Sequence, residues 1–347
     1  YMKNDVDILL CFDLPAERIA HEGPITAVDR TIHHSEYVAS RLNRSLREDV
    51  RILKSFVRAS HAYGDTCAVG HMGFTGISLE LLVIQKSGLM SALESLVQLE
   101  REPLDPLKRS QNELKGISTF KDDCVFIIDP TDPNRNIAAS FSRRAYCWIR
   151  NRVKELITDG LSDDKILDLI IEKQIPVSRP PEWIEDHLLI YEIIADTEKH
   201  YTIVRDKLHR FANRIARGLM YERTGERRFG QVTFEIYIEN ERFSVGFLVE
   251  NPEISQCYTR RGPPSNIPGA SQFKIAHPDS YEREGYLWIE GRRRWVKAKE
   301  MLDHLITTNL PDGMEICPEM TDVGLRLANV LYQIVLPLER FPIKARV

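Results

Sequence analysis

The stretch Phe126–Ser140, FIIDPTDPNRNIAAS, decides how the first half of the chain is interpreted, because it turns from apolar to polar at one corner. The apolar run from Cys124 to Ile128 predicts a buried strand. In the two Asp-Pro pairs that follow, Asp132 suits a helix N-cap and Pro133 the first helical position. A helix is therefore predicted to start at this corner and to continue past the alanines.

Arg135 and Asn136 are predicted to occupy the first turn of that helix, beside the end of the strand. A guanidinium fixed at a helix start can present its donors to the edge of a nucleobase, and the Asp-Pro turns restrict its backbone. The common alternative is an ordinary surface arginine. Asn136 is predicted to secure the start of the helix.

Length and composition allow two or three soluble domains. The 347 residues are 43% hydrophobic and 28% charged, with a net charge of -4. Because the global charge is weakly negative, binding to nucleic acid has to come from local clusters of Lys and Arg. The longest apolar runs are far shorter than the ~18 residues that a membrane span requires, so no membrane span is expected. Six scattered cysteines without a CxxC pair favour reduced thiols in the cytoplasm.

Acidic and histidine-containing segments precede the corner. Asp5–Phe12, DVDILLCF, is predicted to be a strand, and Asp5 and Asp7 on one of its faces can hold Mg²⁺ or simply be capping or solvated acids. Thr31, His33 and His34 stand just before a helical pattern. For them a hydrogen-bonding role is favoured over zinc, with an N-cap threonine and surface histidines as the alternative.

A long helical pattern and a glycine-rich loop follow. Apolar residues from Ser35 to Ala62 recur at helical spacing, with a break near Asn43. The segment from Tyr63 to Ser78 holds four glycines, which is typical of a loop. Lys54 on the basic helix face and Tyr63 at the loop can hold a triphosphate, and a solvated helix face is the alternative.

The second half of the chain predicts a separate small α+β domain. A linker is predicted at Pro176–Trp183, then a strand at HLLIYEIIA, a helix at Tyr201–Met220, a hairpin at Gln231–Glu250 and a strand near Tyr286–Ile289. Arg210, Arg214 and Arg217 form a basic stripe on the helix. The segment GRRRWVKAK (291–299), with Trp288 and Trp295, suits phosphate contacts and base stacking, with a solvated charged face as the alternative.

These motifs occur in an order that resembles the archaeal (class I) CCA-adding enzyme, a tRNA nucleotidyltransferase. The matching segments are DVDILLCF, AVDRTIHH, EDVRILKSFVRASHAYG, GFTGISLELL, DPTDPNRNIAAS, RRGPP and EGRRRW. The resemblance implies an α+β protein with three parts. Residues 1–36 would be the remnant of a polymerase-β-like nucleotidyltransferase head, residues 37–178 a helical central domain, and residues 179–347 a C-terminal α+β body and tail domain.

The resemblance also implies the reaction and its residues. The family adds C, C and A to the 3′ end of tRNA from CTP and ATP, without a template, and releases pyrophosphate. Asp7 would be the catalytic carboxylate and a ligand of Mg²⁺. Thr31, His34, Lys54 and Tyr63 would contact the sugar and the triphosphate, with His33 as an alternative to His34, and Arg135 would recognise the base. The body and tail would bind the acceptor stem and T arm; the basic candidates are Arg210, Arg214, Arg217, Arg292, Arg293 and Arg294.

In the family, two further catalytic carboxylates lie upstream of the matched segments. We therefore expect the chain alone to bind tRNA but to add nucleotides negligibly. The alternatives are a poly(A)-polymerase-like nucleotidyltransferase and a non-catalytic RNA-binding fragment. A homodimer is one option for its oligomeric state, and the cytoplasm is the expected location.

Overall fold

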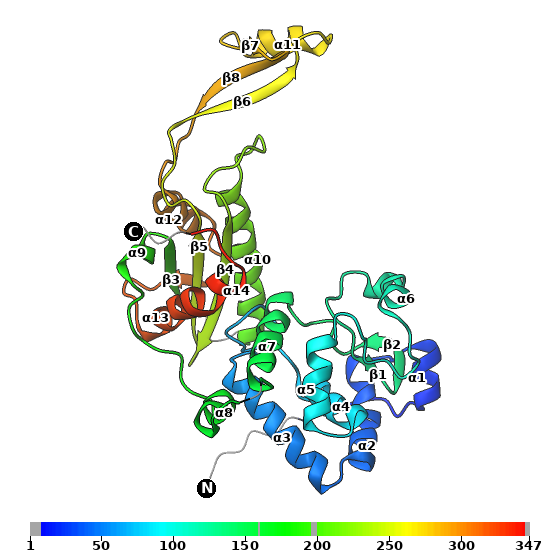
Figure 1. Ribbon diagram of the computed structural model, residues 1–347. Helices are drawn as coiled ribbons and strands as arrows, with labels where there is room; N and C mark the ends of the chain where they lie inside the picture. The colour runs from blue at the N-terminus through cyan, green and yellow to red at the C-terminus, as the bar shows by residue number, and fades with distance from the viewer. Residues whose placement is uncertain (1–7, 159, 196–199, 344–347) are drawn as a thin grey trace. The chain divides into compact units, whose positions relative to one another are not determined.

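The computed structural model describes residues 8–158, 160–195 and 200–343, and the chain divides into two compact units, Tyr1–Gln174 and Ile175–Val347 (Figure 1). The first unit is mainly helical, whereas the second combines an antiparallel sheet with helices. This mixture agrees with the predicted α+β class.

The first unit consists of helices and one short hairpin. Its elements in chain order are α1 (Ala16–Glu22), η1 (Ala27–Arg30), α2 (Thr31–Arg41), α3 (Arg44–Ala59), α4 (Gly76–Lys86), α5 (Leu89–Gln98), α6 (Gln111–Lys115), η2 (Ser118–Phe120), β1 (Ile128–Asp129), β2 (Asp132–Asn136), α7 (Arg143–Leu156) and α8 (Asp163–Ile170).

The core of this unit lies between α3, α4, α5 and α7 (Figure 1). Leu53, Phe56, Leu82, Leu96 and Tyr146 are fully buried there. Burial of each such side chain contributes about 1.5–3 kcal/mol to folding. The core therefore fixes the helices that carry the candidate site.

The helical pattern predicted for residues 35–62 corresponds to two helices, α2 and α3, and the break lies near Asn43, as predicted. Between them the chain turns at Leu42, which has an extended conformation. Asn43 caps α3, because its Oδ1 accepts a hydrogen bond from Leu46 N at 2.9 Å. This N-cap satisfies one of the amides that a helix start leaves unpaired.

The glycine-rich segment is a loop up to Thr75, as predicted, whereas residues 76–78, predicted as its end, form the start of α4. Close backbone packing explains its composition. Tyr63 and Phe74 form a parallel bridge across it, and Phe74 N donates to Ala62 O at 2.8 Å. A Cβ on Gly73 would lie 2.1 Å from Ala62 O, so only glycine fits there. This packing fixes Tyr63 at the start of the loop.

The helix predicted from Asp132 is wrong: residues 128–136 form the β1–β2 hairpin, and the next helix, α7, begins at Arg143. Side-chain carboxylates account for the difference. Asp129 accepts from Thr131 N at 2.9 Å, and Asp132 accepts from Asn134 N at 3.0 Å, so each aspartate stabilises a local turn. The N-cap-like pattern therefore marks turns in a hairpin.

Asn136 secures strand backbone and not a helix start, which corrects its predicted role. Its Oδ1 accepts from Ile127 N at 2.9 Å and from Ala138 N at 3.0 Å. Its Nδ2 donates to Val125 O and to Asp123 Oδ2, both at 2.8 Å. The buried amide thus replaces several missing backbone partners.

The strand predicted for Asp5–Phe12 is not present over its described part. Residues 8–12 have no regular structure, and Ile8 and Leu10 are 84% and 87% exposed. A strand needs a hydrogen-bonded neighbour, and the described residues provide none for this segment. Asp5 and Asp7 lie outside the described residues.

The second unit follows the predicted order closely. Its elements are α9 (Glu182–Glu185), β3 (Leu188–Ala195), α10 (Tyr201–Met220), β4 (Val232–Glu239), β5 (Arg242–Val249), β6 (Cys257–Pro264), α11 (Gly269–Ala276), β7 (Tyr281–Arg283), β8 (Tyr286–Arg292), α12 (Ala298–Asn309), β9 (Met314–Ile316), α13 (Asp322–Asn329), the π-helix η3 (Val330–Val335) and α14 (Leu336–Leu338). The predicted β3, α10, β4–β5 hairpin and β8 are confirmed.

An antiparallel sheet of order β4-β5-β3-β9 forms the centre of this unit, with helices on both faces. Along β5, Phe243, Val245 and Phe247 alternate onto the face that α10 covers. On the other face a Cβ on Gly246 would lie 2.7 Å from Leu331 Cδ1, so α13 and η3 approach the sheet closely there.

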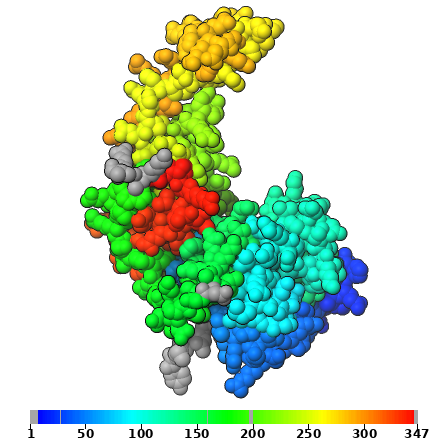
Figure 2. Space-filling model, viewed as in Figure 1, coloured from blue at the N-terminus to red at the C-terminus, as the bar shows by residue number. Residues whose placement is uncertain are grey.

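Strands β6, β8 and β7 form a separate three-stranded sheet that extends from the second unit as an arm, with α11 at its far end (Figures 1 and 2). At its base Ile254 N donates to Val296 O at 2.9 Å.

Within the described residues no single helix is both long and apolar enough to cross a membrane; α4 and α5 meet the length and composition criteria only as a pair bent by 110°.

Replacing Asn136 tests its role in the hairpin. Asn136→Ala leaves two amides and a carbonyl without their partner, and an unsatisfied buried group costs ~1–3 kcal/mol. We expect the free energy of unfolding, measured by urea denaturation, to fall by about 3 kcal/mol or more. Ser140→Ala, at an exposed position, serves as the control and should change it by less than ~0.5 kcal/mol. Equal effects of both substitutions would contradict this role.

Candidate functional site

The buried carboxylate of Asp129 joins two of the predicted site residues. On α2, the Nε2 atom of His34 lies 2.6 Å from Asp129 Oδ2. Arg135 Nη1 donates a hydrogen bond to the same oxygen at 3.3 Å. The side chain of Asp129 is fully buried, whereas that of Arg135 is 36% exposed. One carboxylate therefore fixes the positions of a histidine and an accessible guanidinium that are 101 residues apart.

The two oxygens of Asp129 have different partners. Oδ1 accepts from the Thr131 amide at 2.9 Å and from the Thr131 hydroxyl at 2.7 Å, while Oδ2 faces His34 and Arg135. Burial raises the pKa of Asp129, but the hydrogen bonds and charge of its partners outweigh that effect and the net pKa lies below its usual value. Asp129 is therefore ionised at neutral pH.

Two more aspartates hold the segment before α2 in place. Arg30 donates to Asp132 Oδ2 through Nε at 2.8 Å and Nη2 at 2.6 Å. Asp29 accepts from Phe12 N at 2.9 Å and from the Thr26 amide and hydroxyl, both at 2.6 Å. Within the segment AVDRT (27–31), Arg30 thus anchors the start of α2 to the hairpin. The partner of Asp132 could not be predicted from the sequence, because Arg30 lies 102 residues away. The contact of Asp29 with Thr26, three residues away, is a local capping signal that the sequence does offer.

Of the two adjacent histidines, His34 is the one beside Arg135. His33 Nε2 instead lies 2.7 Å from Leu14 O, because neighbouring residues of a helix point in different directions. Thr31 is exposed at the first position of α2. The structure thus places His34 and Arg135 together and Thr31 one turn before His34.

Lys54 and Tyr63 form a second group at the start of α4. Lys54 Nζ lies 2.5 Å from Glu80 Oε1, and a Cβ on Gly76 would lie 3.0 Å from Tyr63 Oη and 3.4 Å from Lys54 Nζ. The ammonium and the phenol therefore converge on the helix N-terminus, where free amides and the helix dipole favour anions.

Thr75, the N-cap residue of α4, makes this group suitable for an anion. Its Oγ1 is buried and has no hydrogen-bond partner among the described groups. A buried hydroxyl without a partner is costly, and a bound oxyanion would satisfy it. Helix α2, which carries His34, contacts α4, whose N-terminus forms part of this group.

The predicted metal ligand cannot be placed, since Asp7 lies outside the described residues. Among residues 8–158, 160–195 and 200–343, no three His, Cys, Asp or Glu side chains form a group that could hold a metal ion. Asp29, Asp129 and Asp132 are all engaged in protein hydrogen bonds. These described acids do not fit a Mg²⁺ site.

The predicted basic stripe is exposed on α10. Arg210, Arg214 and Arg217 point away from the core, and the opposite face, with Leu208 and Ile215 among others, is buried. Arg214 makes only a weak contact, from Nη2 to Asn309 O at 3.5 Å. The exposed basic face of α10 is therefore accessible to a polyanion.

The three arginines of the RRR motif differ in their surroundings. Arg292 and Arg294 are exposed, and the Arg294 guanidinium lies 4.8 Å from the Trp295 ring centroid. Arg293 is 10% exposed, pairs with Glu222 at 3.1 Å and donates to Ser255 O at 2.9 Å. Arg293 therefore braces the base of the arm.

The six cysteines, all within the described residues, carry free thiols.

Comparison with known proteins identifies the family. Residues 48–162 match the family model of the second domain of tRNA nucleotidyltransferase. The chain is 33% identical to the CCA-adding enzyme of Halorubrum lacusprofundi over 370 residues, which cover 97% of this chain and 74% of that enzyme. It is 27% identical to the CCA-adding enzyme of Methanococcus maripaludis and 26% identical to that of Saccharolobus islandicus, over 93% and 86% of this chain.

These relationships define a protein of the tRNA nucleotidyltransferase class. The chain belongs to the family of CCA-adding enzymes. It spans 65% of the length of the Saccharolobus relative and 72% of the Methanococcus relative.

Replacing Asp129 tests its role as the anchor. Asp129→Asn removes a charged acceptor, and hydrogen bonds to charged groups contribute ~1.5–3 kcal/mol. We expect the free energy of unfolding at pH 7 to fall by about 2–3 kcal/mol. Because folding lowers the pKa of Asp129 below its ordinary value of 3.8, its contribution is present above pH 3.8 and is lost as the pH falls through the folded pKa. The difference between wild type and variant should therefore shrink as the pH is lowered below 3.8.

The exposed Asp13→Asn serves as the control, with an expected change within ~0.5 kcal/mol. A difference between wild type and Asp129→Asn that stays constant down to pH 3, or grows, would contradict the anchor role.

Proposed function

We propose that this chain acts in the template-free addition of C, C and A to the 3′ end of tRNA, with CTP and ATP as substrates and pyrophosphate as product. Family membership supports the reaction class. The observation that carries the proposal is the joint anchoring of His34 and Arg135 by Asp129, because it presents a fixed, partly exposed guanidinium from a rigid hairpin.

Arg135 can select C and A by one feature that these bases share. Cytosine N3 and adenine N1 are hydrogen-bond acceptors on the Watson–Crick edge, whereas uracil and guanine carry an N–H at the corresponding position. An arginine side chain only donates. Because only Nη1 of Arg135 has partners among the described residues, its other donors are available to an acceptor edge.

We assign the triphosphate to Lys54, Tyr63 and the N-terminus of α4. The ammonium provides a positive charge, the phenol a donor, and the buried Thr75 hydroxyl a further donor. Glu80 holds the Lys54 ammonium in place when no phosphate is bound. Thr31 and His34 would contact the ribose.

The Mg²⁺ assignment rests on Asp7 and on the family, because the described acids do not fit a metal site. When bound, Mg²⁺ would neutralise phosphate charge and polarise the reacting groups. The residues described here bind and orient the nucleotide. The body and tail, with the acceptor stem and T arm of tRNA as partner, are proposed to hold the primer.

Nucleotide selection by Arg135→Ala tests the proposed base recognition. Loss of donors to one base edge should reduce the preference for CTP and ATP over UTP and GTP by ~1–3 kcal/mol. The measurement is the equilibrium dissociation constant of each nucleotide, so it does not depend on turnover. Arg101→Ala, an exposed arginine outside the site, is the matched control. Unchanged selection in Arg135→Ala would refute the assignment.

The basic stripe on α10 is tested by the salt dependence of tRNA binding. Replacing Arg210, Arg214 and Arg217 with Ala should weaken binding and make the slope of log K against log salt concentration shallower by roughly 2–3, at ~0.7–0.9 per lost phosphate contact. A triple alanine variant of the exposed Arg101, Lys121 and Lys165 matches the charge change. If both triple variants have the same slope, the stripe does not contact tRNA.

A further inference from the structure

A groove in the first unit has no role in the site described above. It has a volume of about 770 Å³ and lies between the end of α2, the end of α4 and the loop before α6. Its lining residues are Tyr37, Arg41, Gln85, Lys86, Pro103, Leu104, Asp105, Pro106, Lys108, Arg109 and Pro130. We call it the basic groove, because Asp105 is its one acid and four of its residues are Lys or Arg.

The charge of the basic groove is not neutralised by the protein. Asp105 is buried and pairs with Arg109 at 2.6 Å. Arg41, Lys86 and Lys108 have no carboxylate within ion-pair distance in the described parts of the chain. Three cations therefore face this groove without a counter-ion, a composition that attracts an anion. Lys86 also lines a second cavity, which contains Glu94 and Glu102.

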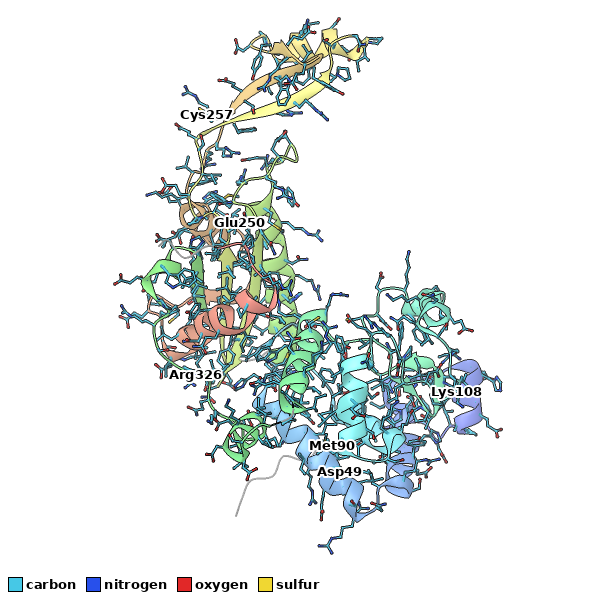
Figure 3. The ribbon with its side chains drawn as sticks, in the orientation of Figure 1. Asp49, Met90, Lys108, Glu250, Cys257 and Arg326 are labelled. Atoms are coloured by element: carbon cyan, nitrogen blue, oxygen red, sulfur yellow. The ribbon has the colours of Figure 1, made fainter. Side chains whose placement is uncertain are left out.

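The loop that carries Lys108 is held rigidly. Asp105 accepts from the amides of Leu107 and Arg109 at 3.0 and 3.1 Å, and Arg109 Nη2 donates to Pro133 O at 2.9 Å. Lys108 has a φ of +56°, a left-handed conformation that favours Gly or Asn. It keeps a charged side chain at this unfavourable position, on the surface of the unit near β2 (Figure 3).

A flat platform stands beside these cations. The Arg41 guanidinium lies 3.8 Å from the centroid of the Tyr37 ring, and Arg41 is exposed. A nucleobase can stack on a guanidinium plane that an aromatic ring supports. Cations at separate points next to a stacking platform are typical of sites for single-stranded nucleic acid. An acidic peptide would use the cations but not the platform.

The basic groove lies next to the candidate nucleotide site. Tyr37 follows His34 by one helical turn on the same face of α2, and Pro130 directly follows Asp129. We propose that the basic groove binds the phosphodiester backbone of an RNA strand, with a base stacked on Arg41. That the RNA is tRNA rests on the proposed function; the binding of an RNA strand does not. The triphosphate of a free nucleotide has the same anionic chemistry.

The test compares two double variants that remove the same charge. Lys86→Gln with Lys108→Asn removes two groove cations, and Asn tolerates the left-handed backbone at position 108. Lys121→Gln with Lys165→Gln removes two exposed lysines elsewhere in the unit. Fluorescence anisotropy measures binding of a labelled single-stranded RNA and of tRNA without CCA over a range of salt concentrations. For the groove variant the slope against salt should be shallower by about 1.4, at ~0.7 per contact with a single strand.

A third variant separates stacking from charge. Arg41→Lys keeps the charge and removes the plane, so it should weaken RNA binding while the salt slope stays that of wild type. Thermal unfolding by circular dichroism should be the same for all variants. If the groove double variant has the slope of the lysine control, the proposal is wrong. If it weakens binding of ATP alone and leaves RNA binding unchanged, the groove is a nucleotide-phosphate site and the RNA assignment is wrong.

The proposed function and this inference can fail separately. If nucleotide selection is unchanged in Arg135→Ala but the salt slope of RNA binding is shallower in the groove variant, only the proposed function is wrong. If nucleotide selection is reduced in Arg135→Ala but the groove variant has the salt slope of the lysine control, only the RNA-binding proposal is wrong.

Discussion

The buried carboxylate of Asp129 hydrogen-bonds both to the hairpin turn of the first unit and to two candidate site residues. One oxygen closes the turn between β1 and β2, and the other receives His34 and Arg135. An ionised carboxylate can be buried here because four groups hydrogen-bond to it: the amide and the hydroxyl of Thr131, His34 Nε2 and Arg135 Nη1. The positive charge nearby adds to this stabilisation. The hairpin and the orientation of the two site residues therefore depend on each other.

The rest of the first unit positions this arrangement. Asp29 and Arg30 attach the start of α2 to the N-terminal segment and to the hairpin, so that His34 points toward Arg135. The buried core beneath α3 and α4 places Lys54 and the helix N-terminus at Gly76. Each group alone resembles an ordinary polar cluster. Their placement on packed helices and one hairpin is what suits them to a nucleotide with an aromatic base at one end and phosphates at the other.

Sequence patterns predicted elements whose stability is local, and failed where distant partners decide. The α10 helix and the β4–β5 hairpin follow from apolar periodicity and turn residues within a few positions. The Asp-Pro corner failed because Asp129 and Asp132 stabilise turns and bind residues about 100 positions away, which no local pattern reveals. Residue patterns made Lys54, Tyr63 and Arg135 candidates, and the family resemblance assigned the roles of these residues and of His34. Asp129, which holds His34 and Arg135, and Glu80, which holds Lys54, became visible as their partners only in the fold.

The central claim is that the hairpin group and the α4 group bind the same nucleotide. Hydrogen–deuterium exchange during a CTP titration tests it most directly. We expect the amides of residues 128–136 and of residues 75–79 to be protected together, with the same half-saturating CTP concentration. Protection of only one segment, or two clearly different half-saturating concentrations, would contradict it.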